Sequence, residues 1–409
     1  MFMENRYDKY KDSGIAWIGE IPEHWKVKKG KILFKKEERP VRDNDEIVTC
    51  FRDGEVTLRS NRRIDGFTNA MKEVGYQGVR RGDLVIHNMD AFAGAIGVSD
   101  SDGKSTPVYS VCTPKNNVEA NVYYYAYLLR SYALGGVIQS LAKGIRERST
   151  DFRYKEFGDL YYQQPPIEEQ QSIASYLDQK CGEIDKLITL QEEMITKLQS
   201  YKQSVITEAV TKGLDKNLPL KDSGIEWIGE IPEHWSVVKI KYLAKIKSGD
   251  SISSNEIMQE GIYEVYGGNG LMGFCNKKNV DGVNIIIGRV GALCGNVRLI
   301  SESKFITDNA LILNCFDNAL YSYMYIMLKA ANLNNLNTSN AQPLITGSKV
   351  LNVSLPIPSL SEQQSIADYL DQKCSEIDEL ISIKQQKIEK LKDYKKSLIF
   401  ECVTGKRKV

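Results

Sequence analysis

Two stretches of the chain carry apolar residues at the spacing of one long helical face. The first stripe consists of Ile173, Leu177, Ile184, Ile188, Ile195, Leu198, Val205 and Ala209. The second stripe repeats this spacing at Ile366, Leu370, Ile377, Ile381, Ile388, Leu391, Leu398 and Cys402. Apolar residues at steps of three, four or seven over about six heptads are typical of a coiled-coil seam. The pattern therefore predicts two helices of about 40 residues, each roughly 60 Å long at about 1.5 Å per residue.

Helix-ending residues flank both predicted helices. Prolines stand before them, where proline is tolerated, and glycines stand near their ends, where glycine closes a helix. These residues are Pro165, Pro166 and Gly213 for the first helix, and Pro356, Pro358 and Gly405 for the second. A long helix with one apolar stripe needs a partner. We expect the twin helix of the same chain to pack against it antiparallel, which would give the molecule a pseudo-two-fold axis. The alternative is pairing with a second copy of the chain.

Two sequence elements occur twice. KDSGIAWIGEIPEHW at 11–25 recurs as KDSGIEWIGEIPEHW at 221–235, and EQQSIASYLDQKC at 169–181 recurs as EQQSIADYLDQKC at 362–374. The first pair is offset by 210 residues and the second by 193, so the segment between the elements is 17 residues longer in the first half. The segments in between show no evident similarity to each other. The chain thus runs constant–variable–constant twice.

This plan predicts two globular domains of mixed α/β (α+β) fold class, separated by two long antiparallel coiled-coil helices. The expected parts are a first variable domain at 1–164, a first long helix at 165–213, a second variable domain at 214–361 and a second long helix at 362–409.

The repeated WIGEIPEHW element is predicted to be a short packing element. Trp17, Ile18, Ile21 and Trp25 would form an apolar cluster beside His24. His24 and its copy His234 could in principle act as catalytic bases. A histidine duplicated within a strict repeat, with no nucleophile nearby, is better interpreted as structural.

The variable segments mix strands and helices. Residues 82–99 have the texture of buried strands with glycine turns, and residues 123–134 predict a helix with an aromatic face that we assign to the core. Glycine turns also separate predicted strands between 263 and 313. Gly268, Gly270 and Gly273 match G-x-G-x-x-G, but a dinucleotide fingerprint needs a helix after the glycines. Here the turn-like FCNKKNVDG follows, so we do not predict a cofactor site.

Composition excludes several protein classes. No apolar run approaches the ~18 residues of a membrane span, and the N-terminal residues lack the apolar core of a signal peptide. The eight cysteines are scattered without a C-x-x-C pair, which argues against a disulfide framework or a metal site. The chain contains neither a G-x-x-x-x-G-K-[ST] loop for ATP nor the [N/D]-P-P-[Y/F] motif of an amino methyltransferase, which Gln164-Pro165-Pro166-Ile167 only mimics. We expect a cytoplasmic protein without a catalytic site or a cofactor of its own.

Charge is unevenly distributed although the net charge is only +1. Residues 26–164 hold 23 basic and 18 acidic side chains, and residues 236–361 hold 11 and 8. Residues 165–213 hold 5 and 8. The positive excess therefore lies in the variable segments, where contacts to nucleic-acid phosphates would need it.

Arginine is the side chain best shaped to read guanine and to hold phosphate, and asparagine or glutamine can read adenine. The candidate DNA contacts of the first variable segment are Arg59, Arg62, Arg63, Arg80, Arg81, Lys143, Arg146, Arg148 and Arg153. Those of the second are Asn269, Lys277, Lys278, Arg289, Asn337, Asn340 and Gln342. For each residue the alternative is an ordinary solvated surface.

The duplicated KDSGI-x-WIGEIPEHW, the duplicated EQQSIA-x-YLDQKC-x-EID and the two unlike segments between them resemble the specificity subunit of a type I restriction–modification enzyme over essentially the whole chain. GDLVIHNMDAFAGAIG and VYGGNGLMG also resemble target-recognition domains of that family. The resemblance implies that each variable segment reads one half of a split DNA site. It also implies that the paired helices fix the unread spacer.

The resemblance further implies a set of partners. The helices would dock two methyltransferase subunits that bind S-adenosylmethionine and methylate adenine. A restriction subunit would use ATP and Mg²⁺ for translocation and cleavage, and this chain would bind none of these small molecules. The competing hypotheses are a stand-alone nucleotide-dependent enzyme that uses the glycine-rich stretch, and a DNA-binding scaffold or regulator outside restriction.

Overall fold

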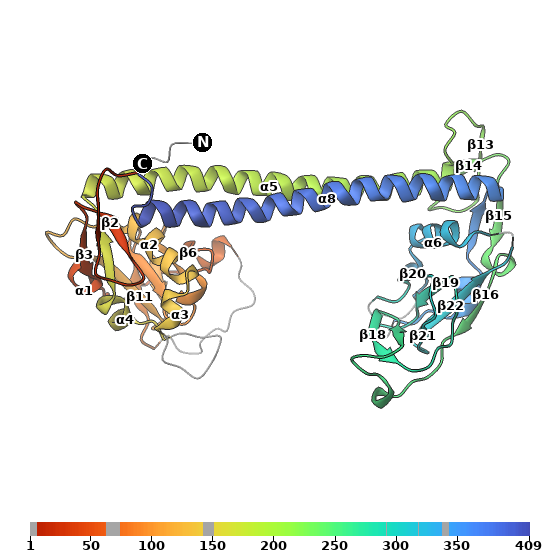
Figure 1. Ribbon diagram of the computed structural model, residues 1–409, viewed down its shortest axis with the longest axis horizontal. Helices are drawn as coiled ribbons and strands as arrows, with labels where there is room; N and C mark the ends of the chain where they lie inside the picture. Colours follow the sequence, from red (N-terminus) through yellow and green to blue (C-terminus); the bar gives the residue numbers. More distant parts are fainter. Residues whose placement is uncertain (1–5, 63–73, 142–150, 292, 318, 338–342) are drawn as a thin grey trace. The chain divides into compact units, whose positions relative to one another are not determined.

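The computed structural model describes residues 6–62, 74–141, 151–291, 293–317, 319–337 and 343–409 (Figure 1). The chain divides into two compact units. Unit 1 consists of Met1–Gln191 with Gln386–Val409, and unit 2 consists of Glu192–Gln385. Both division points fall inside long helices, so each unit combines one variable segment with half of each helix.

The two long helices are α5 (Ile167–Lys212) and α8 (Leu360–Val403). In unit 1 the start of α5 packs beside the end of α8, where Ile173 and Cys402 share one buried cluster. In unit 2 the end of α5 packs beside the start of α8, where Ala209 and Ile366 share another cluster. The helices therefore pack antiparallel within each unit and pair inside one chain, so the stripes need no second copy.

All twelve residues predicted to pair the helices are at least half-buried. The fully buried ones are Ile173, Leu177, Ile184, Ile366, Leu370, Ile377 and Ile388. The half-buried ones are Ile188, Ile195, Leu198, Ile381 and Leu391. The predicted apolar seam is confirmed.

One ion pair accompanies the seam in each unit. Lys395 Nζ lies 2.7 Å from Asp185 Oδ1 in unit 1, and Lys202 Nζ lies 2.6 Å from Asp378 Oδ2 in unit 2. Each residue of the first pair has its counterpart in the second at the repeat offset of 193 residues. Such partly exposed pairs contribute only about 0–1 kcal/mol, so the apolar seam provides most of the stabilisation.

Glycines end both long helices, as predicted. Gly213 and Gly405 adopt left-handed φ values of 72° and 75°. A Cβ on Gly405 would collide with Pro22, and a Cβ on Gly213 would approach the Trp235 ring to 3.2 Å. Each repeated WIGEIPEHW element thus packs directly against the end of a long helix.

The two variable segments share one sheet topology. In unit 1 the four-stranded order is β4-β11-β8-β9, and in unit 2 it is β16-β22-β19-β20, with every pairing antiparallel. The strands of unit 1 are β4 (Phe34–Lys36), β11 (Tyr109–Pro114), β8 (Leu84–His87) and β9 (Ile96–Val98). Those of unit 2 are β16 (Ala244–Ser248), β22 (Ala310–Cys315), β19 (Asn284–Gly288) and β20 (Val297–Ile300). The segments therefore have related folds although their sequences show no evident similarity.

One helix in each unit connects this sheet to the long helices. These are α2 (Val122–Leu134) and α6 (Tyr321–Ala330). The aromatic face predicted on α2 lies in the core, since Tyr124 and Tyr125 are fully buried. The backbone N–H groups of Asn121 and Leu320 donate to the side chains of Gln170 and Gln363 at 2.8 and 2.9 Å. Both glutamines belong to the repeated EQQSIA element, which thus holds the starts of α2 and α6.

Smaller elements complete each unit. In unit 1 they are β1 (Tyr10–Asp12), β2 (Glu20–Pro22), β3 (Lys26–Lys29), α1 (Gly30–Leu33), β5 (Val48–Cys50), β6 (Val56–Leu58), β7 (Gln77–Val79), β10 (Gly103–Ser105), α3 (Val137–Ser140), α4 (Tyr154–Asp159) and β12 (Tyr161–Gln164). In unit 2 they are β13 (Leu220–Asp222), β14 (Glu230–Pro232), β15 (Ser236–Lys239), β17 (Tyr263–Gly267), β18 (Gly270–Cys275), β21 (Phe305–Ile306), α7 (Gly347–Leu351) and β23 (Ser354–Ile357).

The glycine-rich motif lies in a hairpin. Strands β17 and β18 pair antiparallel, with Gly267 opposite Gly270. No helix follows the glycines, so the motif lacks the geometry of a dinucleotide fingerprint. Among the described residues no group of three or more His, Cys, Asp or Glu could hold a metal ion. Within the same part of the chain no helix is long and apolar enough to cross a membrane.

The predicted tryptophan cluster needs one correction. Ile18, Ile21 and Trp25 are buried, but Trp17 is 42% exposed and its copy Trp227 is 39% exposed. The strands β1 and β2 bury the residues that face the helix end, whereas Trp17 lies in the loop between the strands. It therefore contributes little to the core.

The histidines of the repeat hold the starts of the long helices. Trp25 Nε1 donates to Glu169 Oε2 at 2.7 Å, and His24 Nε2 lies 2.7 Å from the other carboxylate oxygen. In the second copy, one oxygen of Glu362, Oε1, interacts with both His234 Nε2 at 2.8 Å and Trp235 Nε1 at 3.2 Å. Both glutamates occupy the first helical turn, where the helix dipole favours a negative charge. This arrangement supports the structural interpretation of His24 and His234.

Replacing Glu362 with glutamine should destabilise the chain in a pH-dependent way. Burial acts to raise the pKa of Glu362, but hydrogen bonds from His234, Ser359 and Trp235 outweigh it and lower the pKa to about 2. A lowered pKa stabilises the fold above the unfolded value of about 4.3, and this stabilisation is lost as the pH falls toward 2. We expect Glu362→Gln to reduce the free energy of unfolding by about 1 kcal/mol at pH 7. The loss should shrink below about pH 4.

Urea denaturation of the full chain followed by tryptophan fluorescence measures this effect. Glu379→Gln removes an exposed carboxyl from the same helix and should change little. Equal effects of the two substitutions at pH 7 would contradict the assigned role of Glu362.

Candidate nucleic-acid interface

Both units carry polar side chains where one strand of the shared sheet ends. In unit 1, β8 ends at His87 and the turn after it holds Asp90, and in unit 2 the turn after β19 holds Arg289. Strands β8 and β19 occupy equivalent positions in their sheets. The two turns are therefore structural counterparts with different side chains.

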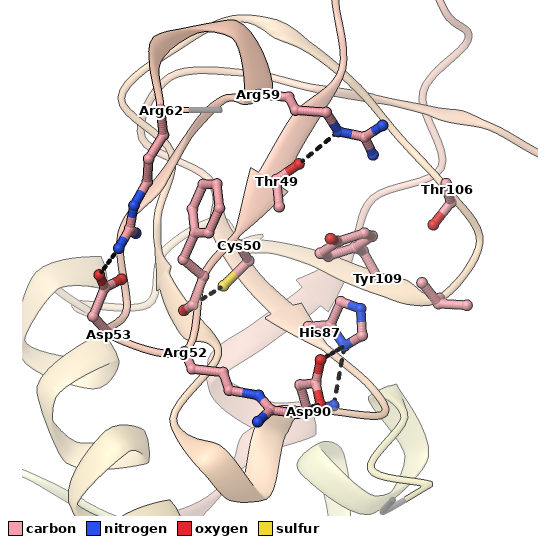
Figure 2. A pocket seen from close by; sticks show the side chains of 12 residues that line it. Thr49, Cys50, Arg52, Asp53, Arg59, Arg62, His87, Asp90, Thr106 and Tyr109 are labelled. Atoms are coloured by element: carbon pink, nitrogen blue, oxygen red, sulfur yellow. Dashed lines mark hydrogen bonds and ion pairs between the residues drawn. The ribbon is translucent and has the colours of Figure 1, made fainter. Parts of the chain in front are cut away.

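A pocket of about 810 Å³ lies beside this turn in unit 1 (Figure 2). Its lining combines three guanidinium groups, two carboxylates, an imidazole and two aromatic rings. The lining residues are Thr49, Cys50, Phe51, Arg52, Asp53, Arg59, Arg62, His87, Asp90, Thr106, Val108 and Tyr109. Such a mixture of donors, acceptors and rings suits nucleic acid, whose phosphates accept hydrogen bonds and whose bases both stack and hydrogen-bond.

His87 is held as a neutral donor. Its Nδ1 accepts the backbone N–H of Asp90 at 3.0 Å, and its ring meets Tyr109 edge-on at 4.7 Å between centroids. Burial lowers the pKa of His87, although the Asp90 carboxylate acts in the opposite direction. Because Nδ1 is an acceptor in the neutral ring, the proton lies on Nε2. His87 can therefore offer one N–H to a ligand in the pocket.

Two of the pocket arginines pair with partly exposed carboxylates. Arg62 pairs with Asp53 at 2.5 Å and lies over the Phe51 ring at 4.2 Å, while Arg52 pairs with Asp90 at 2.9 Å. Exposed pairs of this kind are weak. A phosphate oxygen can therefore replace a carboxylate oxygen at small cost and leave the guanidinium in place.

Two further polar groups line the pocket near its other side. Arg59 Nε donates to Thr49 Oγ1 at 3.4 Å. Thr106 Oγ1 is buried without a hydrogen-bond partner among the described residues. A ligand that donates a hydrogen bond there would satisfy this hydroxyl, which favours a polar occupant.

In unit 2 the equivalent turn gathers three predicted residues. Arg289 Nη1 donates to Ser248 Oγ at 3.2 Å, and its Nε is buried without a hydrogen-bond partner among the described residues. The amide nitrogen of Asn269 lies 3.9 Å from the Cβ position of Gly291 in the same turn. Asn337 accepts the backbone N–H of Leu344 at 3.3 Å, and Leu344 bridges to Val290.

Several predicted contacts lie elsewhere. Arg80 is largely buried, where it holds Asp45 at 3.1 Å and the carbonyl of Gly103 at 2.9 Å, so its role is structural. Arg81 and Arg153 are bound to the Asp100 carbonyl and to Asp151. Lys277 pairs with Glu256 and Lys278 pairs with Asp281. Arg63, Lys143, Arg146, Arg148, Asn340 and Gln342 lie outside the described residues.

The structure adds residues that sequence reasoning missed. Arg52, His87 and Tyr109 line the pocket of unit 1, and Arg298 holds the β17–β18 turn by donating to the Asn269 carbonyl at 2.8 Å. The position of His87 as the last residue of a buried strand was the available signal, because strand ends and the loops after them often carry binding residues.

Comparison with known proteins agrees with this architecture. Residues 232–393 match the type I restriction modification DNA specificity domain. The specificity subunit of the EcoprrI type I restriction enzyme from Escherichia coli is 34% identical over 133 residues, which span 32% of this chain and only 33% of that relative. The putative MjaX type I specificity subunit from Methanocaldococcus jannaschii is 27% identical, and the alignment covers 96% of both chains.

Solved structures share the fold along nearly the whole chain. A structure from a study of complex assembly and conformational transition of the type I restriction–modification system has a TM-score of 0.75 at 16% identity, covering 94% of this chain and 98% of the other. The HsdS subunit from Thermoanaerobacter tengcongensis has a TM-score of 0.56 at 17% identity with the same coverage. In its duplicated helices, its two related sheets and these relatives, the chain is similar to the specificity subunits of type I restriction–modification systems.

Proposed function

We propose that this chain reads a bipartite, asymmetric DNA sequence for a type I restriction–modification complex, with one half-site for each unit. The observation that carries this proposal is the equivalent sheet edge of the two units, which has the same topology but different side chains. In unit 1 the edge presents His87 and the arginines of the pocket. In unit 2 it presents Arg289 and Asn269. Two related scaffolds with unlike readers suit a site whose halves differ.

The division of labour follows from the side chains. Guanidinium groups such as those of Arg59 and Arg62 bind phosphates and position the duplex, independently of sequence. Arg289 and Asn269 can read guanine and adenine through paired hydrogen bonds. The neutral His87 contributes one directional donor. Arg59 and Arg62 would set the affinity for DNA. Arg289, Asn269 and His87 would set the sequence specificity.

We further propose that the helices dock two methyltransferase subunits. Exposed apolar residues recur on both helices at equivalent positions, as in Leu187 with Leu380 and Tyr201 with Tyr394, each at least 44% exposed. A repeated surface of this kind suits two copies of one partner. Those partners would bind S-adenosylmethionine and methylate adenine, and a restriction subunit would use ATP and Mg²⁺. This chain would bind none of these small molecules and would be non-catalytic.

The competing function is a stand-alone nucleotide-dependent enzyme. The β17–β18 hairpin lacks the helix that such a phosphate site requires. Equilibrium dialysis of the purified chain with S-adenosylmethionine or ATP separates the two hypotheses, because binding without partners would favour the enzyme. A scaffold outside restriction would not co-purify with a methyltransferase, which makes co-purification the most informative experiment.

Removing a pocket arginine should weaken DNA binding through its phosphate contact. We expect Arg62→Ala to lower affinity about tenfold and to reduce the slope of log affinity against log salt by about 1. The measurement is a fluorescence-anisotropy titration with duplex DNA at several salt concentrations. Lys197→Ala removes an exposed charge from α5 and should leave the slope unchanged. An unchanged slope for Arg62→Ala would remove this arginine from the interface.

Exchanging one reader should change one half-site. If residues 26–164 are replaced by the equivalent segment of another specificity subunit, the first half-site should change and the second should persist. Methylome sequencing of cells that express the chimera gives the new target. A change in both halves would refute independent readers.

Shortening both helices should change the spacer alone. Deletion of residues 188–194 together with the equivalent 381–387 removes one heptad, or about 10 Å at 1.5 Å per residue. That length corresponds to about three base pairs at roughly 3.4 Å each. We expect the methylated half-sites to stay the same while their separation falls. Retention of the original spacer would contradict a ruler function of the helices.

A further inference from the structure

The two copies of the repeated hairpin each expose one tryptophan. Trp17 lies between β1 and β2 and is 42% exposed, and Trp227 lies between β13 and β14 and is 39% exposed. Figure 1 shows β13 and β14 on the opposite side of the long helices from the four-stranded sheet of unit 2. A large aromatic side chain in such a loop adds little to the core, so its presence needs another explanation.

The loop that carries the tryptophan is held by the same hydrogen bond in both copies. Asp12 Oδ1 accepts the backbone N–H of Gly14 at 2.9 Å, and Asp222 does the same for Gly224 at 2.9 Å. Gly14 has a φ of 72° and its counterpart a φ of 70°. The indole is thus presented in the same way twice, and little conformational entropy would be lost on binding.

No single contact within the fold explains why both copies of the hairpin carry this tryptophan. The Trp17 side chain hydrogen-bonds to Tyr132 in unit 1. Asn121 before α2 and Leu320 before α6 are equivalent residues, because each donates its backbone N–H to a glutamine of the repeat. Counting from these two residues, Tyr132 in unit 1 corresponds to Ala331 in unit 2. Alanine cannot make that hydrogen bond. The shared property is the exposed indole, retained in both copies although the adjoining variable segments have no evident similarity.

The charge around each tryptophan selects the kind of partner. Asp12, Glu20 and Glu23 are exposed on the first hairpin beside Lys11, and Asp222, Glu226, Glu230 and Glu233 are exposed on the second beside Lys221, so each hairpin has an acidic excess. These carboxylates would repel DNA phosphates. They suit a protein whose apolar pocket has a rim of lysine or arginine. Tryptophan is enriched among the residues that contribute most to binding at the centre of protein interfaces.

We propose that Trp17 and Trp227 are equivalent anchors, each binding one copy of the same protein, and that this protein is the methyltransferase subunit. The identification of the partner rests on the proposed function. The anchors extend the docking surface from the long helices to the hairpins at their ends. Each anchor belongs to a different unit, which accounts for two partner copies on one chain.

Alanine substitutions in the full chain test the anchors. Trp17→Ala and Trp227→Ala should each weaken one of two binding events by about 30-fold or more, leaving a 1:1 complex at concentrations where the wild type forms a 2:1 complex. The double variant should bind neither copy. Mass photometry with the purified methyltransferase subunit counts the copies, and circular dichroism and DNA affinity report whether each variant is folded.

Matched variants keep the test specific. Tyr123→Ala with Tyr242→Ala removes one exposed aromatic side chain from each unit and should leave the 2:1 complex intact. Glu20→Lys with Glu230→Lys keeps both tryptophans but reverses the rim charge, and should also weaken binding. Wild-type binding by the double tryptophan variant would overturn the anchors.

Two outcomes distinguish this inference from the function it rests on. If Tyr201→Ala with Tyr394→Ala abolishes binding while the double tryptophan variant binds normally, docking on the helices stands and the anchors fail. If the wild-type chain binds no methyltransferase subunit at all, the proposed function itself fails.

Discussion

The buried apolar seam between α5 and α8 is the contact on which the rest of the molecule depends. Each helix is too long and too amphipathic to remain single in water, and its apolar stripe is covered by the other helix of the same chain. Because the stripes match, the start of one helix lies beside the end of the other within each unit. In each unit the repeated hairpin, the helix α2 or α6 and the four-stranded sheet are then attached to this pair of helices.

The attachment uses the same few side chains twice. A glutamate in the first helical turn binds a tryptophan and a histidine of the hairpin. A glutamine one residue later accepts the backbone N–H of the residue that caps α2 or α6. Both are fixed parts of the repeated sequence, whereas the side chains proposed to read DNA belong to the variable segments, at the ends of β8 and β19. The proposed reading surface can therefore change without altering the residues that attach each sheet to the long helices.

The sequence allowed the helices to be predicted residue by residue, because a heptad stripe depends only on local spacing. It did not reveal that the variable segments share a sheet topology, because antiparallel pairing can be satisfied by many different apolar residues. The sequence shows which arginines could contact DNA, but it does not show which of them are free of structural roles in the fold. Arg62 lines a pocket, whereas Arg80 is largely buried and pairs with Asp45, which lies 35 residues away in the sequence. Likewise Arg52 and His87 become candidate site residues only because the fold places them in the lining of the same pocket.

The composition of unit 1 has a consequence for the order in which the chain folds. This unit requires Gln386–Val409, which the ribosome makes only after the whole of unit 2. Tyr124 donates to the Val403 carbonyl at 3.0 Å and Tyr10 to the Gly405 carbonyl at 3.0 Å, so these last residues fill its core and its surface. Unit 2 is continuous and can close first during synthesis, while unit 1 must wait with apolar surface uncovered. A nascent chain is thus most open to chaperones and proteases at its beginning, and its earliest residues are among the last to become protected.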